Sequence, residues 1–206
     1  RDHKKTVEKI IKDHLCTGCG VCVGVCPSGA LTFDSSQNDT LSPILNDNLC
    51  KYCGRCYEIC PGKGVKFNDL VDKSDLEDAT FHNEVGNFRA VMSCHATDAS
   101  VRKKGASGGF VTALTGHLLE TKKVDGVVVV RNVGERLFSI EAFLALTEDE
   151  LLQGQQSKYF MAPFHKVIKE IIVTKERYAI VGLPCQISAI SLILKNNKSL
   201  QGRIPL

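Results

Sequence analysis

Two patterns of apolar and polar positions divide the chain near residue 87. Before that point, short apolar groups are interrupted by glycine, proline and cysteine. Residues 1–14 are an exception, because Val7, Ile10 and Ile11 recur at the spacing of one face of a short amphipathic helix. Residues 68–80 are acidic and lack periodicity, which is typical of a linker or a surface helix.

After residue 87, strand-like and helix-like periods alternate. The sequence predicts strands at residues 88–94, 127–130, 138–146 and 177–182, with helices starting near residues 107, 147, 163 and 184. Ser107 is a plausible N-cap, 101–105 has the pattern of a basic loop, and Cys94 that of a core cysteine. This alternation predicts an α/β domain with a parallel or mixed sheet. Residues 202–206 resemble the start of a further strand, so we expect a truncated sheet.

Composition places the chain among ordinary globular proteins, with 43% hydrophobic and 24% charged residues. No apolar run approaches the ~20 residues of a membrane-spanning helix, and no signal peptide is visible, which favours the cytoplasm. The net charge of +3 is too small to indicate nucleic-acid binding. Residues 15–100 carry 6 basic and 11 acidic side chains, whereas 101–206 carry 15 and 9. The difference reflects either two ordinary solvated surfaces or a basic half that holds an anionic cofactor.

Cysteine changes this picture, because eight of the ten cysteines form two identical runs. Each run reads C-x2-C-x2-C-x3-C-P, and the two copies lie 34 residues apart. Matching residues flank them, including Leu31 with Val65 and Phe33 with Phe67, which we expect on short strands. This spacing is the signature of bacterial two-cluster ferredoxins, and the duplication predicts two pseudo-symmetric halves.

The spacing has a physical reason. Three cysteines at short intervals wrap one cubane, and glycines such as Gly18, Gly20 and Gly54 let backbone N–H groups approach the sulfurs. The fourth cysteine follows a helical turn and ligates the other cluster. The alternative is a pair of four-cysteine zinc sites, although structural zinc usually uses two separated CxxC pairs. The predicted ligands are Cys16, Cys19, Cys22 and Cys60 for cluster one, and Cys50, Cys53, Cys56 and Cys26 for cluster two.

Three segments of the second half could bind a cofactor. Residues 107–109 place two glycines at a helix start, which is a ready anion site but often only a cap. Residues 155–160 form a polar turn that, alone, is most often an ordinary loop. Residues 182–186 lie where a strand meets a helix, the place where α/β sheets bind ligands. Cys185 in that turn is either an activated thiol or a buried structural cysteine.

Together, the double cysteine run and the ordered segments SGGFVTAL (107–114), DGVVVV (125–130), QQSKYF (155–160) and IVGLPCQISAI (180–190) resemble the coenzyme F420 hydrogenase and dehydrogenase beta-subunit family. The resemblance implies FAD in the α/β domain, with electrons passing between clusters and a two-electron carrier such as F420. It also implies that the flavin is lined by Ser107, Gly108, Gly109, Thr112, Ser157, Lys158, Tyr159, Pro184, Cys185 and Gln186. Family members are usually longer than this chain.

We therefore expect an α+β chain with a two-cluster ferredoxin-like domain at 1–70, a linker at 71–86 and an α/β flavin domain at 87–206. The expected function is that of an F420-linked iron-sulfur flavin oxidoreductase subunit, working with a redox partner subunit of hydrogenase, dehydrogenase or reductase type. The alternative is a non-catalytic electron carrier that docks on a partner enzyme. Relatives acting on chlorophyll-type substrates or sulfite leave the final acceptor open.

Overall fold

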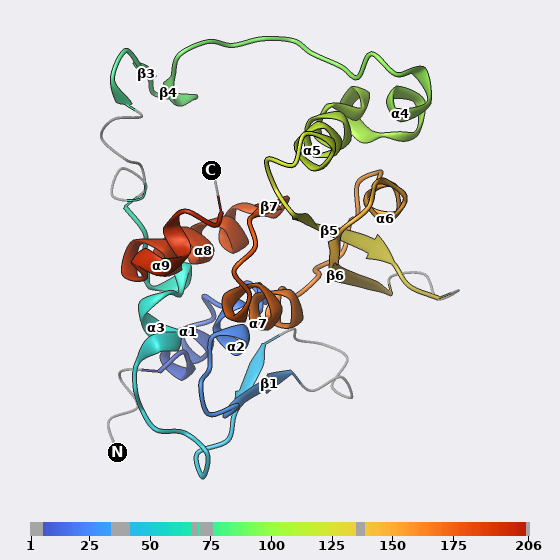
Figure 1. The fold of residues 1–206 in the computed structure, drawn as a ribbon. Helices are drawn as coiled ribbons and strands as arrows, with labels where there is room; N and C mark the ends of the chain where they lie inside the picture. Colours follow the sequence, from blue (N-terminus) through green and yellow to red (C-terminus); the bar gives the residue numbers. More distant parts are fainter. Residues whose placement is uncertain (1–5, 34–41, 67–69, 71–75, 135–138, 205–206) are drawn as a thin grey trace.

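The computed structural model describes residues 6–33, 42–66, 70, 76–134 and 139–204 (Figure 1). The first module consists of short elements around the two cysteine runs. They are α1 (Glu8–Lys12), α2 (Val21–Gly24), β1 (Leu31–Phe33), β2 (Pro43–Leu45), α3 (Arg55–Glu58) and the 3-10 turn η2 (Pro61–Lys63). No helix in the described ranges is long and apolar enough to cross a membrane.

The duplication in the sequence appears as two matching helix starts. Gly20 precedes α2 with φ 80° and ψ −7°, and Gly54 precedes α3 with φ 77° and ψ −8°. Positive φ of this kind favours glycine. Each short helix is followed by the fourth cysteine of its run, Cys26 or Cys60, so the expected pseudo-symmetry is present in the backbone.

The second half is built on a mixed three-stranded sheet in the order β6-β5-β7. β5 (Gly126–Asn132) pairs antiparallel with β6 (Ile140–Ala145) and parallel with β7 (Tyr178–Ile180). The expected mixed sheet is therefore confirmed. Phe138, at the start of the strand predicted at 138–146, lies outside the described residues.

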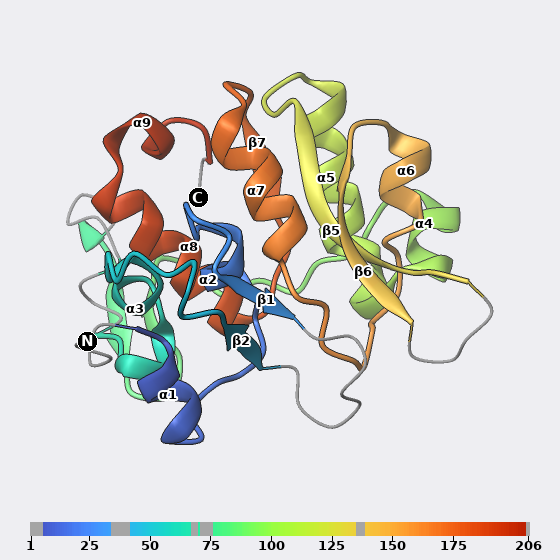
Figure 2. The same cartoon turned by 90° about the horizontal axis from the view of Figure 1, so that it is seen from below.

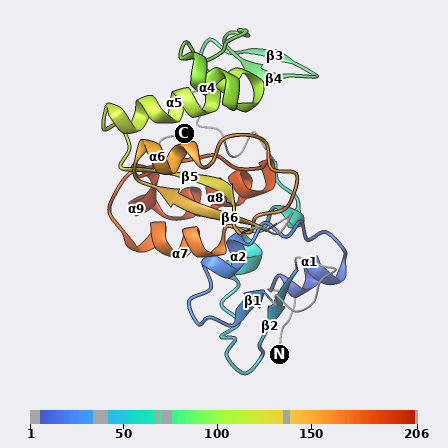
Figure 3. The same cartoon turned by 90° about the vertical axis from the view of Figure 1, so that its right-hand side faces the viewer.

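Helices cover both faces of this sheet (Figure 3). α4 (Ala99–Lys104), α5 (Phe110–Glu120) and α6 (Glu148–Leu152) lie on one side, and α7 (His165–Val173) lies on the other. α6 starts with the capping box expected from Thr147 and Glu150. α8 (Pro184–Asn196) and α9 (Lys198–Gln201) follow β7, with α8 beside the cysteine-rich module (Figure 2).

The two halves share one hydrophobic core, although the sequence predicts two domains. Val21 and Leu31 of the first half are 0% and 1% exposed, and they belong to the same cluster as Phe164, Ile168 and Ala189. β5 joins this cluster through Val128, while its alternate residues Val127 and Val129 face a second, smaller cluster under α5 and α6. The cysteine module is thus packed on the α/β half through α2, α7 and α8 rather than tethered to it.

Several local predictions are wrong. Residues 89–94 are not a strand. β4 (Gly86–Phe88) instead pairs with β3 (Thr80–His82) in an exposed hairpin that spans the end of the predicted linker. Residues 99–104 form α4 rather than a basic loop, because Asp98 caps a helix start by accepting from the Val101 N–H at 2.8 Å.

Other corrections concern single residues. Ser107 makes no cap hydrogen bond and has φ 47°, inside the 3-10 turn η5 (Ala106–Gly109). Cys94 is exposed rather than in the core. β1 pairs with β2 at residues 43–45, and Val65 is in no strand. Phe67 lies outside the described residues, and 202–204 form a turn after α9 rather than a strand.

Gly24 of α2 packs closely against Ile168 of α7, so a substitution at Gly24 tests whether the two halves share one core. A Cβ at Gly24 would lie 2.6 Å from Cβ of Ile168 and 3.0 Å from the His165 carbonyl oxygen. We expect Gly24→Ala to destabilise the protein by about 1–3 kcal/mol, because α2 and α7 must separate. Thermal unfolding followed by circular dichroism measures this effect. Gly202→Ala is the matched control, since its Cβ would meet nothing within 4 Å. Equal thermal unfolding midpoints for the two variants would contradict the close packing of α2 on α7.

Candidate iron-sulfur and cofactor sites

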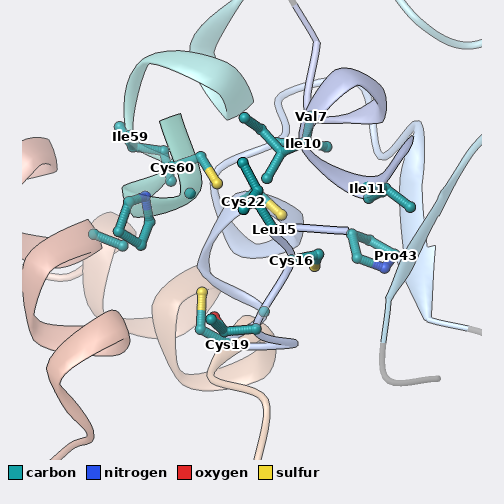
Figure 4. A pocket seen from close by; sticks show the side chains of 15 residues that line it. Val7, Ile10, Ile11, Leu15, Cys16, Cys19, Cys22, Pro43, Ile59 and Cys60 are labelled. Atoms are coloured by element: carbon teal, nitrogen blue, oxygen red, sulfur yellow. The ribbon is translucent and has the colours of Figure 1, made fainter. Parts of the chain in front are cut away.

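A first hollow opens between the two cysteine runs. Its walls include Cys16, Cys19 and Cys22 from the first run and Cys60 from the second, together with Ala189 of α8. Figure 4 shows these four side chains on different walls around one space, among apolar residues of α1 such as Ile10. The last cysteine of the second run therefore joins the first three of the first run.

A second hollow has the complementary composition. It is lined by Cys50, Cys53 and Cys56 of the second run and by Cys26 of the first. The structure thus groups the eight cysteines into the two crossed sets expected from the sequence. Among the described residues, no three potential ligands converge as they would around a single metal ion. The thiols instead line the walls of each hollow.

Burial controls the protonation of these thiols. Burial raises the pKa of Cys22 above its usual value, and the neighbouring thiols of Cys60 and Cys16 raise it further. Burial also raises the pKa of Cys56 and Cys60. A buried thiolate is costly without a nearby positive charge, so a cationic iron core fits these positions and its binding would release protons.

Backbone and hydroxyl donors point at the sulfurs. Burial alone would raise the pKa of Cys26, but the Leu31 N–H, the Ser28 hydroxyl and two further backbone N–H groups outweigh it and lower the pKa. Cys26 Sγ lies 3.8 Å from Ser28 Oγ, and the Tyr52 N–H donates to Cys50 Sγ at 3.4 Å. Such donors stabilise ligand thiolates and tune the potential of an iron-sulfur centre.

A third space, the sheet cavity, lies between α5 and the carboxyl ends of β5 and β7. Its volume of about 550 Å³ is within the range of small-molecule and cofactor sites. Valines from α5, β5 and β7 line it, and Tyr159 and Phe160 lie on its wall as exposed aromatic rings. An apolar cavity with aromatic walls suits a planar ring system.

The sheet cavity brings together part of the predicted flavin set. Gly108, Gly109, Pro184 and Cys185 do not line it. Gly109 instead packs against α4, where a Cβ would lie 2.6 Å from the Val101 carbonyl oxygen. These two glycines therefore shape the turn into α5. The predicted residues that line the cavity are Ser107, Thr112, Ser157, Lys158, Tyr159 and Gln186.

The flavin residues predicted from the sequence left out three polar residues of this cavity, Thr115, Gln155 and Gln156, although the last two lie in the candidate segment 155–160. Thr115 lies one turn after Val111 on the same face of α5, a spacing that could have revealed it. Gln155 is the most informative of the three, because its buried Nε2 has no hydrogen-bond partner. A buried unpaired donor on a cavity wall is suited to an acceptor atom of a ligand.

A basic annex continues the sheet cavity past Gln155, Gln156 and Lys158. It has a volume of about 350 Å³ and adds Lys104 and Arg131 to its walls. Arg131 is oriented by Glu141 at 2.8 Å and by Gln153 at 2.7 Å. Burial lowers the pKa of Lys158, whose ammonium group donates to the carbonyl oxygens of Gln155 and Gln156. The annex therefore presents cations beside a largely apolar cavity.

The turn at residues 182–186 separates the sheet cavity from the first hollow. Gln186 is 2% exposed and fixes the turn, since its Oε1 accepts from the Leu183 N–H at 2.7 Å and its Nε2 donates to the Ala162 carbonyl at 2.8 Å. Cys185 does not line the cavity, and a side-chain interaction with the Cys19 thiol lowers the pKa of Cys185. The predicted cofactor residue Cys185 thus lies on the cluster side of the turn.

Crossed sets of four cysteines in a ferredoxin-like module, packed on a mixed α/β sheet, define an iron-sulfur electron-transfer protein. Residues 15–97 match the family model of the 4Fe-4S dicluster domain, which favours iron-sulfur clusters over zinc. Residues 91–169 match the family model described as coenzyme F420 hydrogenase/dehydrogenase, beta subunit N-term. The family resemblance stated from the sequence is confirmed.

The curated relatives of this chain have names that refer to coenzyme F420 and to a hydrogenase, a sulfite reductase or a formate dehydrogenase. The coenzyme F420 hydrogenase subunit beta of Methanococcus voltae is 34% identical over 112 residues, which cover 53% of this chain and 40% of the relative. The coenzyme F420-dependent sulfite reductase of Methanocaldococcus jannaschii is 29% identical over 190 residues, covering 89% of this chain and 26% of the relative. The F420-dependent formate dehydrogenase subunit beta of that organism is 32% identical over 105 residues, which cover 50% of this chain and 27% of the relative. The chain spans less than half the length of each of these three.

Proposed function

We propose that this chain is the electron-transfer part of an F420-linked flavin oxidoreductase. In this proposal, two 4Fe-4S clusters fill the first and second hollows, with the crossed cysteine sets as ligands. FAD occupies the sheet cavity and basic annex. Coenzyme F420 or a similar hydride carrier is the two-electron donor or acceptor, and a partner redox subunit exchanges electrons with the clusters.

One observation carries the proposal. The sheet cavity, which six of the predicted flavin residues line, and the first hollow both adjoin the start of α8, the cavity through Leu183 and Gln186 and the hollow through Ala189. A bound flavin would supply the conversion between hydride and single-electron chemistry, which clusters alone cannot perform. The names of the relatives support F420 as the carrier, and the domain match supports the clusters.

The residues of the chain fit the parts of FAD. The apolar walls of the cavity, with the exposed rings of Tyr159 and Phe160, suit an isoalloxazine ring, and Gln155 Nε2 offers a donor to one of its acceptor atoms. Lys104 and Arg131 in the basic annex suit the phosphates of a dinucleotide. The turn at 106–109 opens α5 beside the cavity, where N–H groups favour anions.

Anaerobic purification followed by acid release of bound cofactors tests the proposal. We expect FAD at a stoichiometry near that of the chain, and bleaching of the cluster absorption when reduced F420 is added. Other hydride donors, assayed with an artificial dye as acceptor, measure the specificity for F420. Intact clusters with no released flavin, and no binding of added FAD, would contradict the proposal and favour the carrier without a flavin.

A further inference from the structure

Arg131 is held in one orientation at the wall of the basic annex. It lies on β5 opposite Glu141 of β6, and its Nε and Nη2 atoms donate to Glu141 Oε1 at 3.0 and 2.8 Å. Its Nη1 atom donates to Gln153 Oε1 at 2.7 Å. The guanidinium also lies over the Phe143 ring, with its Cζ 4.2 Å from the ring centroid. Because these contacts already fix the side chain, a ligand that binds it loses little further conformational entropy.

The fixed guanidinium keeps hydrogen-bond donors for a ligand. A guanidinium carries five N–H groups in a planar fork, and Glu141 and Gln153 accept from three of them. Among the residues that the structure describes, no further atom accepts from Arg131, so one N–H on each terminal nitrogen remains. The side chain of Arg131 is 33% exposed, and it lines the annex. Paired N–H donors of this kind match the oxygens of a phosphate.

In the described part of the chain, the annex wall contains cations and neutral amides but no carboxylate. Lys104, the last residue of α4, and Lys158 line it together with Arg131. The Glu150 carboxylate is within electrostatic reach of Arg131, but it accepts from two backbone N–H groups at the start of α6 and does not line the annex. The annex therefore favours an anion that carries more than one negative charge.

A buried donor lies at the border between the annex and the sheet cavity. Gln155 lines both spaces, and its Nε2 is buried with no hydrogen-bond partner in the described structure. A buried amide without an acceptor costs free energy that a bound ligand can recover. A ligand that passes from the cavity into the annex would place acceptor atoms beside Gln155.

From these observations we propose that the basic annex is a subsite for a diphosphate group, and that Arg131 selects dinucleotides such as FAD over FMN and riboflavin. This inference rests on the proposed function, which places the flavin ring in the sheet cavity. FMN has the ring and one phosphate, for which the cavity offers Lys158. FAD adds a second phosphate and an adenosine, and the annex adds Lys104 and Arg131 to the available cations.

Isothermal titration calorimetry on the anaerobically purified, flavin-free protein tests the subsite. ADP is the probe, because it carries the diphosphate without the ring system. We expect ADP and FAD to bind at least tenfold more weakly to Arg131→Gln than to the parent, and FMN and riboflavin to change less than twofold. Arg131→Lys keeps the charge but loses the planar fork, so its affinity for ADP should lie between those two proteins. Arg177→Gln is the matched control with parental affinities, since Arg177 also pairs with a carboxylate, that of Asp125, but lines neither space.

A second variant separates ligand binding from the pairing of β5 with β6. Lys104 is exposed at the end of α4 and lines the annex, whereas its exposed neighbour Lys103 does not. Lys104→Gln should weaken ADP binding at least threefold and Lys103→Gln should leave it unchanged, although each variant removes one charge from the same helix. Loss of ADP binding in Arg131→Gln but not in Lys104→Gln would overturn the subsite, because the effect would then arise from the strand pair.

Other results would also overturn the subsite. They are equal affinity for ADP in the parent and in Arg131→Gln, or a loss of FMN binding as large as the loss of FAD binding. The inference and the proposed function fail separately. If ADP binds through Arg131 and no flavin binds, the diphosphate subsite stands and the flavin function is wrong. If FAD binds but Arg131→Gln binds ADP and FAD as the parent does, the flavin function stands and the role of Arg131 is wrong.

Discussion

Replacing Cys60 with alanine is expected to damage the same cluster as replacing Cys19, although 41 positions separate the two residues. Replacing Cys26 with alanine should likewise damage the same cluster as replacing Cys53. The reason is that each hollow combines three cysteines of one run with the last cysteine of the other. Loss of one thiolate leaves an iron corner without its ligand, so the cluster loses iron or does not assemble.

Iron analysis and the properties of the surviving cluster measure this effect. The parent should hold about eight iron atoms per chain, and each variant should lose between about one and four of them. The Cys19→Ala and Cys60→Ala proteins should show the same resonance spectrum and midpoint potential for their surviving cluster. The Cys26→Ala and Cys53→Ala proteins should also match each other, and the two pairs of variants should differ. If Cys60→Ala instead resembled Cys53→Ala, each run would ligate its own cluster and the crossed assignment would be wrong.

Replacing Thr112 with tryptophan is expected to remove flavin from the protein while the clusters remain. Thr112 lines the sheet cavity from α5, on the side away from the first hollow, and an indole there would occupy the space proposed for the isoalloxazine ring. We expect FAD to bind at least tenfold more weakly, a change of about 1.4 kcal/mol or more. Acid-released flavin per chain, compared with iron per chain, measures this effect.

His117→Trp provides the matched control for this variant. His117 is exposed on the same helix and does not line the sheet cavity, so the same added side chain should leave flavin content unchanged. Parental flavin content in Thr112→Trp would show that FAD binds elsewhere or that the cavity is not its site. Loss of flavin in both variants would point to damage of α5 rather than to a filled cavity.

Much of the fold could be predicted because its signals are local. The run Val127–Val130 predicted a strand buried on both faces, and in the structure its alternate residues face two different clusters. Thr147 and Glu150 predicted a helix start from side-chain chemistry alone. The cysteine spacing predicted the grouping into two crossed sets, since ligand geometry restricts the backbone more than propensity does.

The local predictions failed where tertiary contacts override the local sequence pattern. Ser107 has the composition of a cap, yet the close approach of Gly109 to the Val101 carbonyl forces a left-handed turn there. The apolar residues at 88–94 predicted a strand, but only Phe88 lies in one, and Val91 and Met92 are 75% and 80% exposed. Cys185, which the family resemblance placed at the flavin, does not line the sheet cavity, and sequence does not show on which side of the turn its thiol lies.

The common core of the two halves bears on the kinetics of electron transfer. Domains joined by a linker usually move relative to one another, and their redox centres then meet only in a fraction of the conformations. Here Gly20 and Gly24 are seated against Pro163 and Ile168, so the spacing between the first hollow and the sheet cavity is set by side-chain packing. Transfer between them should depend on distance and driving force alone, without a conformational gate that opens and closes during turnover.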